Sequence, residues 1–430
     1  MFRPAIQKLY ILISMAVFCI IMTIISYNSQ LDYKKPNYDK KVQAANYMFE
    51  SLKVLRQEYQ AITVGVKNQN ENLNNNDSVD GFKDPQIERP FSSLDPLETG
   101  LVFYQDDIPG NPSSKLTTLN PNFAALIVDL MIEAGIKLPE ERKRKPKIAI
   151  AFSSSFPGAN LAVLSACKSM DVDPVIITSL SGSNYGAIDY SHFSWLDMEK
   201  KLIDSKIFPS TYSSKAVSIG RGNDSGIGLD SLTIKAIKGA INRHDVDFIY
   251  NEKEIEMSYY IDKRMETYFN RNDNAPYDLF INVGGGHASI GASNEIRKSP
   301  GFLSIEYLNN IYKNNTDDCA MFRFSQNEST PAINIIDIEK LAQDNIPIIN
   351  LSDKKFKIDW SSDKWVNLDE GSQLWRSEYN KSGILFLERK YNFWVVIPCL
   401  LFSLLVVLSV GIYSHFQIKR RMTSYEPDSI

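Results

Sequence analysis

Short apolar runs and helical stripes alternate through the middle of the chain. An apolar run at 148–152 is followed by a small polar turn at 153–158, after which apolar residues recur at helical spacing up to Cys167. This pattern predicts a strand, a tight loop and a helix, the first half of a βαβ unit.

The alternation continues over about 200 residues. Further strands are predicted at 174–179, 216–219, 247–250, 279–283, 332–336 and 347–350. Helices are predicted at 121–135, 194–204, 231–243, 254–269 and 337–343. Repeated strand–helix units predict an α/β domain with a doubly wound, mostly parallel, Rossmann-like sheet that carries helices on both faces.

Two uncharged apolar runs frame this region. Residues 9–27 would form a helix roughly 28 Å long and residues 393–416 one of roughly 36 Å. Both lengths suit a bilayer core, so each run predicts a transmembrane helix. The first run is also compatible with a cleaved signal peptide, but its apolar part is longer than a usual signal core and no A-x-A site follows it. We therefore expect an uncleaved anchor at each end.

Basic residues beside the two runs indicate orientation. Arg3 and Lys8 precede the first run, and basic residues at 419–421 follow the second. The positive-inside rule predicts that both ends are cytoplasmic, in a two-pass protein of the cell (cytoplasmic) membrane. Lysines at 34–41 oppose this orientation, but long domains cross membranes largely regardless of such charges. The body, residues 28–392, is then extracytoplasmic.

The pattern divides the chain into eight segments. Apolar positions between Val42 and Tyr59 step by three and four, which predicts an amphipathic helix. The Asn-rich stretch after it predicts a flexible loop. The expected segments are a cytoplasmic N-terminus (1–8), a transmembrane helix (9–27), a juxtamembrane amphipathic helix (28–65), a flexible loop (66–95), the extracytoplasmic α/β domain (96–350), an extension returning to the membrane (351–392), a second transmembrane helix (393–416) and a cytoplasmic tail (417–430).

The net charge limits which partners the body can bind, and the positions of the four cysteines limit which disulfides can form. The body holds 42 basic and 49 acidic residues, a net charge of −7, which disfavours nucleic-acid binding. Cys19 and Cys399 lie in the apolar runs, whereas Cys167 and Cys319 lie in the body. The spacing leaves open whether the last two form a disulfide or stay free, with Cys167 buried, and we favour free thiols.

Four loops rich in serine and glycine follow predicted strands, at 153–158, 180–187, 220–228 and 284–291. In open parallel sheets ligands bind beyond the carboxyl ends of the strands, so these loops would surround one pocket. Their hydroxyls, backbone N–H groups and glycines suit a carboxylate or phosphate, although short strand–helix turns also need such residues for folding alone. The candidate ligand-binding residues are Ser153, Ser154, Ser155, Phe156, Ser181, Ser183, Asn184, Gly222, Asp224, Gly284, Gly285 and Gly286.

Evidence for catalysis is weaker. No loop has the P-loop or full dinucleotide-binding pattern, and there is no HExxH or Cys/His cluster, so we expect neither a cofactor nor a metal site. A Ser–His–Asp arrangement of a serine at 153–155, His287 and Asp197 is conceivable, but a G-x-S-x-G elbow is missing. Ser194 and Asp197 also fit a helix-capping box. The weak catalytic candidates are His287, Asp197, Glu199 and Ser155.

Several stretches together resemble the poly-gamma-glutamate system protein family. They are DP at 95–96, TGL at 99–101, LNPNFAA at 119–125, SFP at 155–157, FSWLDME at 193–199 and NVGGG at 282–286. The resemblance implies an accessory membrane protein of poly-γ-glutamate capsule synthesis or export. It also implies that the partners are the membrane subunits of the synthase and glutamate or the γ-glutamyl polymer.

Three functions therefore remain open. The first is an accessory protein whose external domain binds an anion. The second is an enzyme, a hydrolase or transpeptidase that trims γ-glutamyl bonds. The third is a non-catalytic scaffold for the synthase complex.

Overall fold

The structure is a computed structural model that falls into two compact units, residues 1–36 with 387–430, and residues 37–386. The residues described are 4–74, 99–102, 110–183, 188–189, 193–253, 256–313, 317–343, 346, 348, 356–360, 364–367, 372–373 and 385–424.

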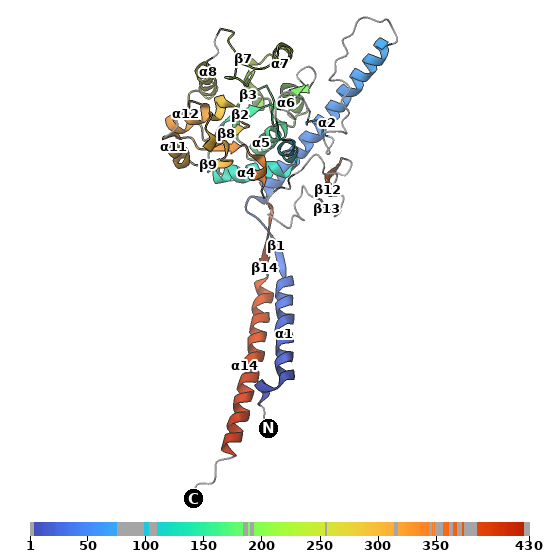
Figure 1. Cartoon of the computed structure of the whole chain (residues 1–430), viewed down its shortest axis with the longest axis vertical. Coiled ribbons are helices and arrows are strands. Elements are labelled where there is room, and N and C mark those ends of the chain that lie inside the picture. Colours follow the sequence, from blue (N-terminus) through green and yellow to red (C-terminus); the bar gives the residue numbers. More distant parts are fainter. Residues whose placement is uncertain are drawn as a thin grey trace. The chain divides into compact units, whose positions relative to one another are not determined.

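The terminal unit is a pair of antiparallel helices. Helices α1 (Leu9–Asn28) and α14 (Phe393–Thr423) lie side by side, and strands β1 (Gln30–Lys34) and β14 (Leu387–Tyr391) pair antiparallel at one end of them (Figure 1). At the other end, the short helix η1 (Ala5–Gln7) is joined to α14. There the backbone N–H groups of Ala5 and Ile6 donate hydrogen bonds to the side chains of Gln417 (3.0 Å) and Ser414 (2.9 Å). The two helices are thus tied together at both ends.

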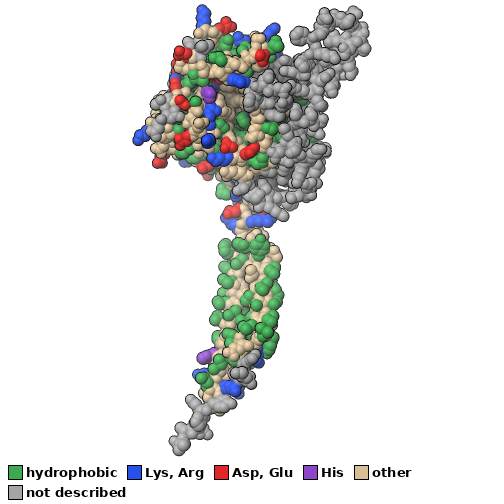
Figure 2. All heavy atoms as spheres, viewed as in Figure 1, with side chains coloured by type: hydrophobic (Ala, Val, Ile, Leu, Met, Phe, Trp, Pro, Cys, Tyr) green, Lys and Arg blue, Asp and Glu red, His purple; other side chains and the backbone are tan. Residues whose placement is uncertain are grey.

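Both helices are long and apolar enough to cross a membrane. No residue of α1 is buried, and hydrophobic side chains cover the visible surface of the pair (Figure 2). Trp394 is 90% exposed. Such a continuous apolar surface is unfavourable in water. The basic residues 419–421 lie in the last turns of α14, beyond its apolar part.

The second unit is built on a seven-stranded sheet with the order β7-β6-β3-β2-β8-β10-β9. Neighbouring strands are parallel except β9, which pairs antiparallel with β10 at one edge. The prediction of an α/β fold with a mostly parallel sheet is therefore confirmed, although it missed β9. The strands are β2 (Lys147–Ser153), β3 (Asp173–Ser179), β6 (Ser214–Ser218), β7 (Asp247–Ile249), β8 (Leu279–Val283), β9 (Gly301–Leu303) and β10 (Ala332–Ile335).

Helices lie on both sides of this sheet, with α8, α11 and α12 on one side and α2, α4 and α5 on the other (Figure 1). Two short antiparallel sheets, β4–β5 and β11–β13, are separate from it. The remaining elements are α2 (Tyr38–Asn74), α3 (Pro112–Thr117), α4 (Asn122–Glu133), η2 (Pro139–Glu141), α5 (Pro157–Ser169), β4 (Ile188–Asp189), β5 (Phe193–Ser194), α6 (Trp195–Asp204), η3 (Ser210–Tyr212), α7 (Ser231–His244), α8 (Met257–Asn270), α9 (His287–Ile290), α10 (Asn294–Arg297), α11 (Ile305–Lys313), α12 (Ala320–Asn327), α13 (Ile338–Ala342), β11 (Phe356–Asp359), β12 (Lys364–Asn367) and β13 (Ser372–Gln373).

The central strand β2 has small residues on one face. Ala149 and Ala151 point into a core that also contains Tyr268 of α8 and Phe324 of α12. The small alanine side chains leave space for these rings, which pack edge to face with centroids 5.4 Å apart. The hydroxyl of Tyr268 donates a 2.8 Å hydrogen bond to the carbonyl of Ile150, which satisfies its buried polar end.

Helix α2 differs from the prediction. It begins at Tyr38 and continues to Asn74, so residues 66–74 are helical and not part of a flexible loop, while 75–95 lie outside the described residues. Its apolar stripe packs on α4 and α5, with Met48 and Leu52 fully buried. Lys41, also buried, pairs with Asp129 of α4 at 3.0 Å. Helix α2 is therefore part of the α/β unit.

Other expectations need smaller corrections. The stretch 298–327, for which no element was predicted, forms β9, α11 and α12. Most of the strand expected at 347–350 lies outside the described residues. Cys167 and Cys319 are both buried free thiols, and Cys319 caps the start of α12 by accepting from the backbone N–H of Phe322.

The close contact of α5 with the turn after α3 gives a stability prediction. A Cβ atom on Gly158 would lie 2.6 Å from Thr118 Oγ1 and 2.8 Å from its carbonyl oxygen, whereas one on Gly239 of α7 would meet nothing within 4 Å. Gly158→Ala should therefore lower the free energy of unfolding by about 1–3 kcal/mol, because the backbone must shift. Gly239→Ala should raise it by about 0.5–1 kcal/mol. Urea unfolding of the full chain in detergent measures both, and effects of the same sign would contradict this packing.

Candidate functional site

The main candidate site is a cavity of about 370 Å³ at the carboxyl edge of the sheet. It lies beside the point between β2 and β8 where the strand order reverses. Loops that follow β2, β3, β6 and β8 all contribute to its wall. The lining residues are Ser153, Ser155, Phe156, Ser179, Ser181, Gly182, Ser183, Arg221, Gly222, Asn223, Asp224, Gly285, Gly286, His287 and Ala288. The structure thus gathers the four predicted loops around one space.

Two of the described ligand-binding candidates do not line this cavity. Ser154 is fully buried, and its N–H donates to the carbonyl of Ser179 at 3.0 Å. Gly284 lies behind the wall with φ of +88°, where an added Cβ would be 3.1 Å from Ser153 Cβ. Asn184 lies outside the described residues.

The loop after β6 has an unusual backbone. Five consecutive residues, from 220 to 224, have positive φ, and three of them are not glycine: Arg221 (+45°), Asn223 (+55°) and Asp224 (+66°). Left-handed conformations are unfavourable for residues that carry a Cβ, so surrounding contacts must hold this loop. The N–H of Gly226 bonds the carbonyls of Gly220 (2.9 Å) and Arg221 (3.0 Å), which closes the turn.

A buried ion pair anchors the same loop. Arg264 of α8 donates from Nε to Asp224 Oδ2 at 2.7 Å, and the two side chains are only 1% and 4% exposed. The Arg264 Nη2 donates to Ser179 Oγ (2.8 Å) and Ser218 Oγ (2.7 Å), at the ends of β3 and β6. Arg264 thereby joins three of the elements around the cavity and neutralises Asp224. Its position inside a helix gave no sign of this role in the sequence.

Lys115 of α3 is a second residue that the sequence did not single out. Its side chain is buried, and Nζ contacts the carbonyl oxygen of Ser155 and lies 2.8 Å from Ser183 Oγ. Burial lowers the pKa of Lys115 well below the ordinary lysine value. The sequence around Lys115 contains no motif that would have predicted this contact.

His287 stands at the start of the short helix α9 and is exposed on the cavity wall. Burial of part of the ring and the nearby Arg297 guanidinium lower the pKa of His287. Arg297 donates to the carbonyl of Gly291 at 2.7 Å, which holds the loop after β8 closed. His287 is therefore a neutral hydrogen-bonding group at neutral pH.

The other two catalytic candidates lie elsewhere. Asp197 forms the capping box with Ser194, and its carboxylate also bonds Arg243 (2.9 Å) and His244 (2.6 Å). These partners hold the pKa of Asp197 down at about 2, despite the opposing effect of burial. Asp197 is thus a structural carboxylate that joins α6 to α7.

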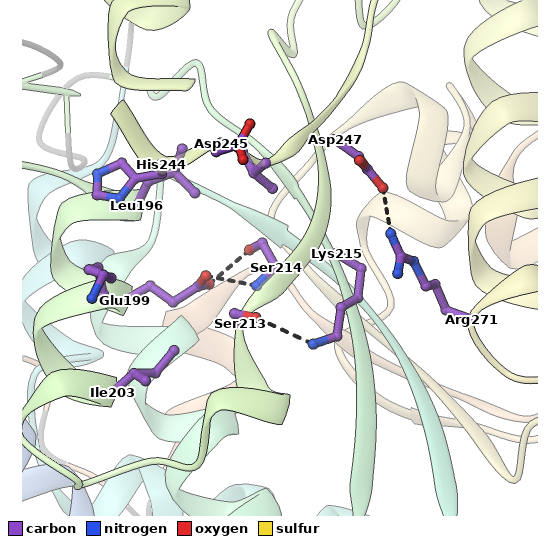
Figure 3. Close-up of a pocket in the computed structure, with 12 residues that line it drawn as sticks. Leu196, Glu199, Ile203, Ser213, Ser214, Lys215, His244, Asp245, Asp247 and Arg271 are labelled. Atoms are coloured by element: carbon purple, nitrogen blue, oxygen red, sulfur yellow. Dashed lines mark hydrogen bonds and ion pairs between the residues drawn. The ribbon is translucent and has the colours of Figure 1, made fainter. Parts of the chain in front are cut away.

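Glu199 lines a separate cavity of about 260 Å³ (Figure 3). Its carboxylate accepts hydrogen bonds from the N–H (2.7 Å) and hydroxyl (2.8 Å) of Ser214, the first residue of β6. Burial raises the pKa of Glu199 to about 7, although the Ser214 bonds oppose the shift. This cavity lies at the amino ends of β6 and β7, whereas His287 follows the carboxyl end of β8.

The structure therefore does not form the conceivable Ser–His–Asp triad. Ser155 and His287 line one cavity, but the carboxylate of Asp197 is engaged at α7. Asp197 and Glu199 are two carboxylates in one short segment of the sequence, but their side chains have separate partners in the fold.

The burial of the Asp224–Arg264 pair predicts a large stability effect. Asp224→Asn should lower the free energy of unfolding by about 3–5 kcal/mol, because Arg264 would remain charged without its partner. The matched control is Asp247→Asn, whose Arg271 pair is 65% and 50% exposed and should contribute less than about 1 kcal/mol. Equal losses in denaturant unfolding would show that the Asp224 pair is not buried as described.

The raised pKa of Glu199 predicts a pH dependence of stability. Its pKa is about 7 in the folded protein against 4.5 for the free side chain, so the folded state binds the proton more tightly. Stability should therefore fall as pH rises from about 4.5 to above 7, by up to about 3 kcal/mol. Glu199→Gln should remove this component and be the more stable form at about pH 8. Parallel pH profiles for the two proteins would contradict the assignment.

Comparison with protein-family models, with characterised proteins and with solved structures gave no match for this chain.

Proposed function

We propose that this chain is an accessory membrane protein of poly-γ-glutamate synthesis or export, and that its α/β domain binds a carboxylate-bearing ligand. The observation that carries the proposal is the convergence of four serine- and glycine-bearing loops on one cavity at the carboxyl edge of the sheet. Ligands of open α/β folds bind at this edge, beside the reversal of strand order. The strand order and the helices on both faces also support a doubly wound, Rossmann-like description.

The chemistry of the wall favours an anion. Asp224 is the acidic residue that lines the cavity, and Arg264 neutralises it. Arg221, which is exposed on the same wall, adds a cationic group. Serine hydroxyls from two loops supply neutral donors, and a volume of about 370 Å³ is within the usual range for small-molecule sites. Together these groups suit a ligand with carboxylates and amide bonds.

Two of the stretches that resemble the poly-γ-glutamate family contribute to this cavity. Ser155 and Phe156 belong to the SFP stretch, and Gly285 and Gly286 belong to NVGGG. This placement supports γ-glutamyl groups as the ligand class.

The terminal unit supports a two-pass membrane topology. Helices α1 and α14 are antiparallel and apolar, so the two chain ends would lie on the same side of a bilayer. Basic residues at 419–421 favour the cytoplasm for that side. The α/β domain would then be extracytoplasmic, where it can meet the growing polymer and the synthase subunits.

A binding experiment tests the ligand class. Isothermal titration of the full chain in detergent with a γ-glutamyl oligomer should give saturable heat, and amidation of the oligomer's carboxylates should abolish it. Arg221→Gln should weaken binding about tenfold or more, because a charge-assisted hydrogen bond is lost. Arg271→Gln is the matched control, since Arg271 lies at the other cavity.

Two results would count against the proposal. One is the absence of heat at millimolar oligomer. The other is equal binding of the native and amidated oligomers, which would show that carboxylates are not recognised. Retained binding to the synthase without any oligomer binding would favour the scaffold function.

A further inference from the structure

Ser183 and Lys115 form a contact at the wall of the main cavity that the binding function does not require. Ser183 lines the cavity and is half-buried, and Lys115 lies behind it with 2% of its surface exposed. The Lys115 Nζ is 2.8 Å from Ser183 Oγ, a hydrogen-bond distance. The two side chains come from segments 68 residues apart in sequence.

The surroundings fix the position of the lysine. Helix α3 is capped by Asn111, whose side chain accepts from the N–H groups of Ser113 and Ser114. The Lys115 carbonyl accepts from Thr118 Oγ1 at 2.7 Å, and Nζ donates to the carbonyl oxygen of Ser155. The Phe156 ring covers Nζ, with 3.6 Å between Nζ and the ring centroid. The amine is therefore held in place and shielded from water.

Lys115 has no ion pair within the part of the chain that the structure describes. Burial lowers the pKa of its amine. A lysine that is desolvated in this way is neutral for a larger fraction of the time near neutral pH, and a neutral amine can accept a proton. Ser183 Oγ–H is the proton donor within reach.

The orientation of Ser183 is also fixed. Its backbone N–H donates to Ser155 Oγ at 2.9 Å, which ties the loop after β3 to the loop after β2. Ser155 Oγ is occupied by this bond, and Lys115 touches the carbonyl and not the hydroxyl of Ser155. Of the serines on this wall, Ser183 is thus the one whose hydroxyl has the lysine as a partner.

We propose that Ser183 is a nucleophile and Lys115 is its general base, so that the cavity catalyses acyl transfer or hydrolysis on an amide or ester of a carboxylate-bearing acyl group. Serine–lysine pairs are a known variant of the serine nucleophile with an adjacent base. That the acyl group is γ-glutamyl rests on the function proposed above. This pair replaces the arrangement with His287 and Asp197 that the sequence suggested.

An amide substrate would react in two steps. Ser183 Oγ attacks the carbonyl carbon and forms a C–O bond, while its proton passes to Lys115 Nζ. Collapse of the tetrahedral intermediate breaks the C–N bond, and Lys115 returns the proton to the leaving nitrogen. Water, or the amine of a second chain, then attacks the Ser183 ester while Lys115 again accepts the proton. The acyl C–O bond to Ser183 then breaks, and Lys115 returns this proton to Ser183 Oγ, which restores the starting pair. Water gives hydrolysis and an amine gives transfer.

A fluorophosphonate tests the nucleophile without knowledge of the substrate. The full chain in detergent is incubated with the probe, which phosphonylates an activated serine hydroxyl and releases fluoride, and peptide mass spectrometry locates the adduct. We expect the adduct on Ser183, no adduct in Ser183→Ala, and labelling about 100-fold slower in Lys115→Met. The controls Lys145→Met and Ser210→Ala, at exposed positions outside this cavity, should label at the wild-type rate.

The pH dependence of wild-type labelling needs no variant and so does not depend on how Lys115→Met folds. The rate should rise with pH along a single titration whose midpoint lies well below the ordinary lysine value of 10.5. A rate without such a titration, an adduct on another serine, or labelling of folded Lys115→Met at the wild-type rate would overturn the pair.

Oligomer titration and fluorophosphonate labelling distinguish a failure of the binding proposal from a failure of the catalytic proposal. If the γ-glutamyl oligomer binds to the wild type and to Ser183→Ala but no adduct forms, the catalytic pair is wrong and the binding function stands. If Ser183 is labelled but the oligomer does not bind, the pair stands and the γ-glutamyl substrate is wrong.

Discussion

The pairing of β2 with β3 on one side and β8 on the other is the constraint on which the α/β unit depends. Parallel strands place their carboxyl ends along one edge, so the order β7-β6-β3-β2-β8-β10-β9 places the loops after β2, β3, β6 and β8 together. Alanines in β2 admit the aromatic core on one face of the sheet. The same strand thereby organises both the packing and the cavity.

Buried charged side chains hold the loops at the carboxyl edge of the sheet in place. The Asp224–Arg264 pair holds a left-handed loop that would be unstable alone, and the bonds of Arg264 to Ser179 and Ser218 join that loop to the ends of two strands. Lys115 of α3 contacts the loops after β2 and β3. The neutralised carboxylate and the shielded amine are the groups on which the proposed anion recognition and chemistry depend.

The terminal unit has a different physical basis. Its helices expose apolar side chains along their surface, and hydrogen bonds and strand pairing close the two ends. Because backbone groups inside a helix satisfy one another, such a pair suits a bilayer, and the α/β unit suits water. The chain therefore joins one unit that exposes its apolar side chains to another that buries them.

The sequence alone determined the features that follow from local pattern. Periodicity identified the two apolar helices, most strands of the sheet and the serine–glycine loops, because burial repeats at fixed spacing along each element. The sequence also indicated the capping box of Ser194 and Asp197, which the structure confirms. It did not reveal that helix α2 continues through an Asn-rich stretch, that the Asp197 carboxylate bonds His244, or that Lys115 and Arg264 reach the cavity wall. Those contacts join residues far apart in the chain, and only the folded arrangement decides which polar side chains lose water and which partners they then find.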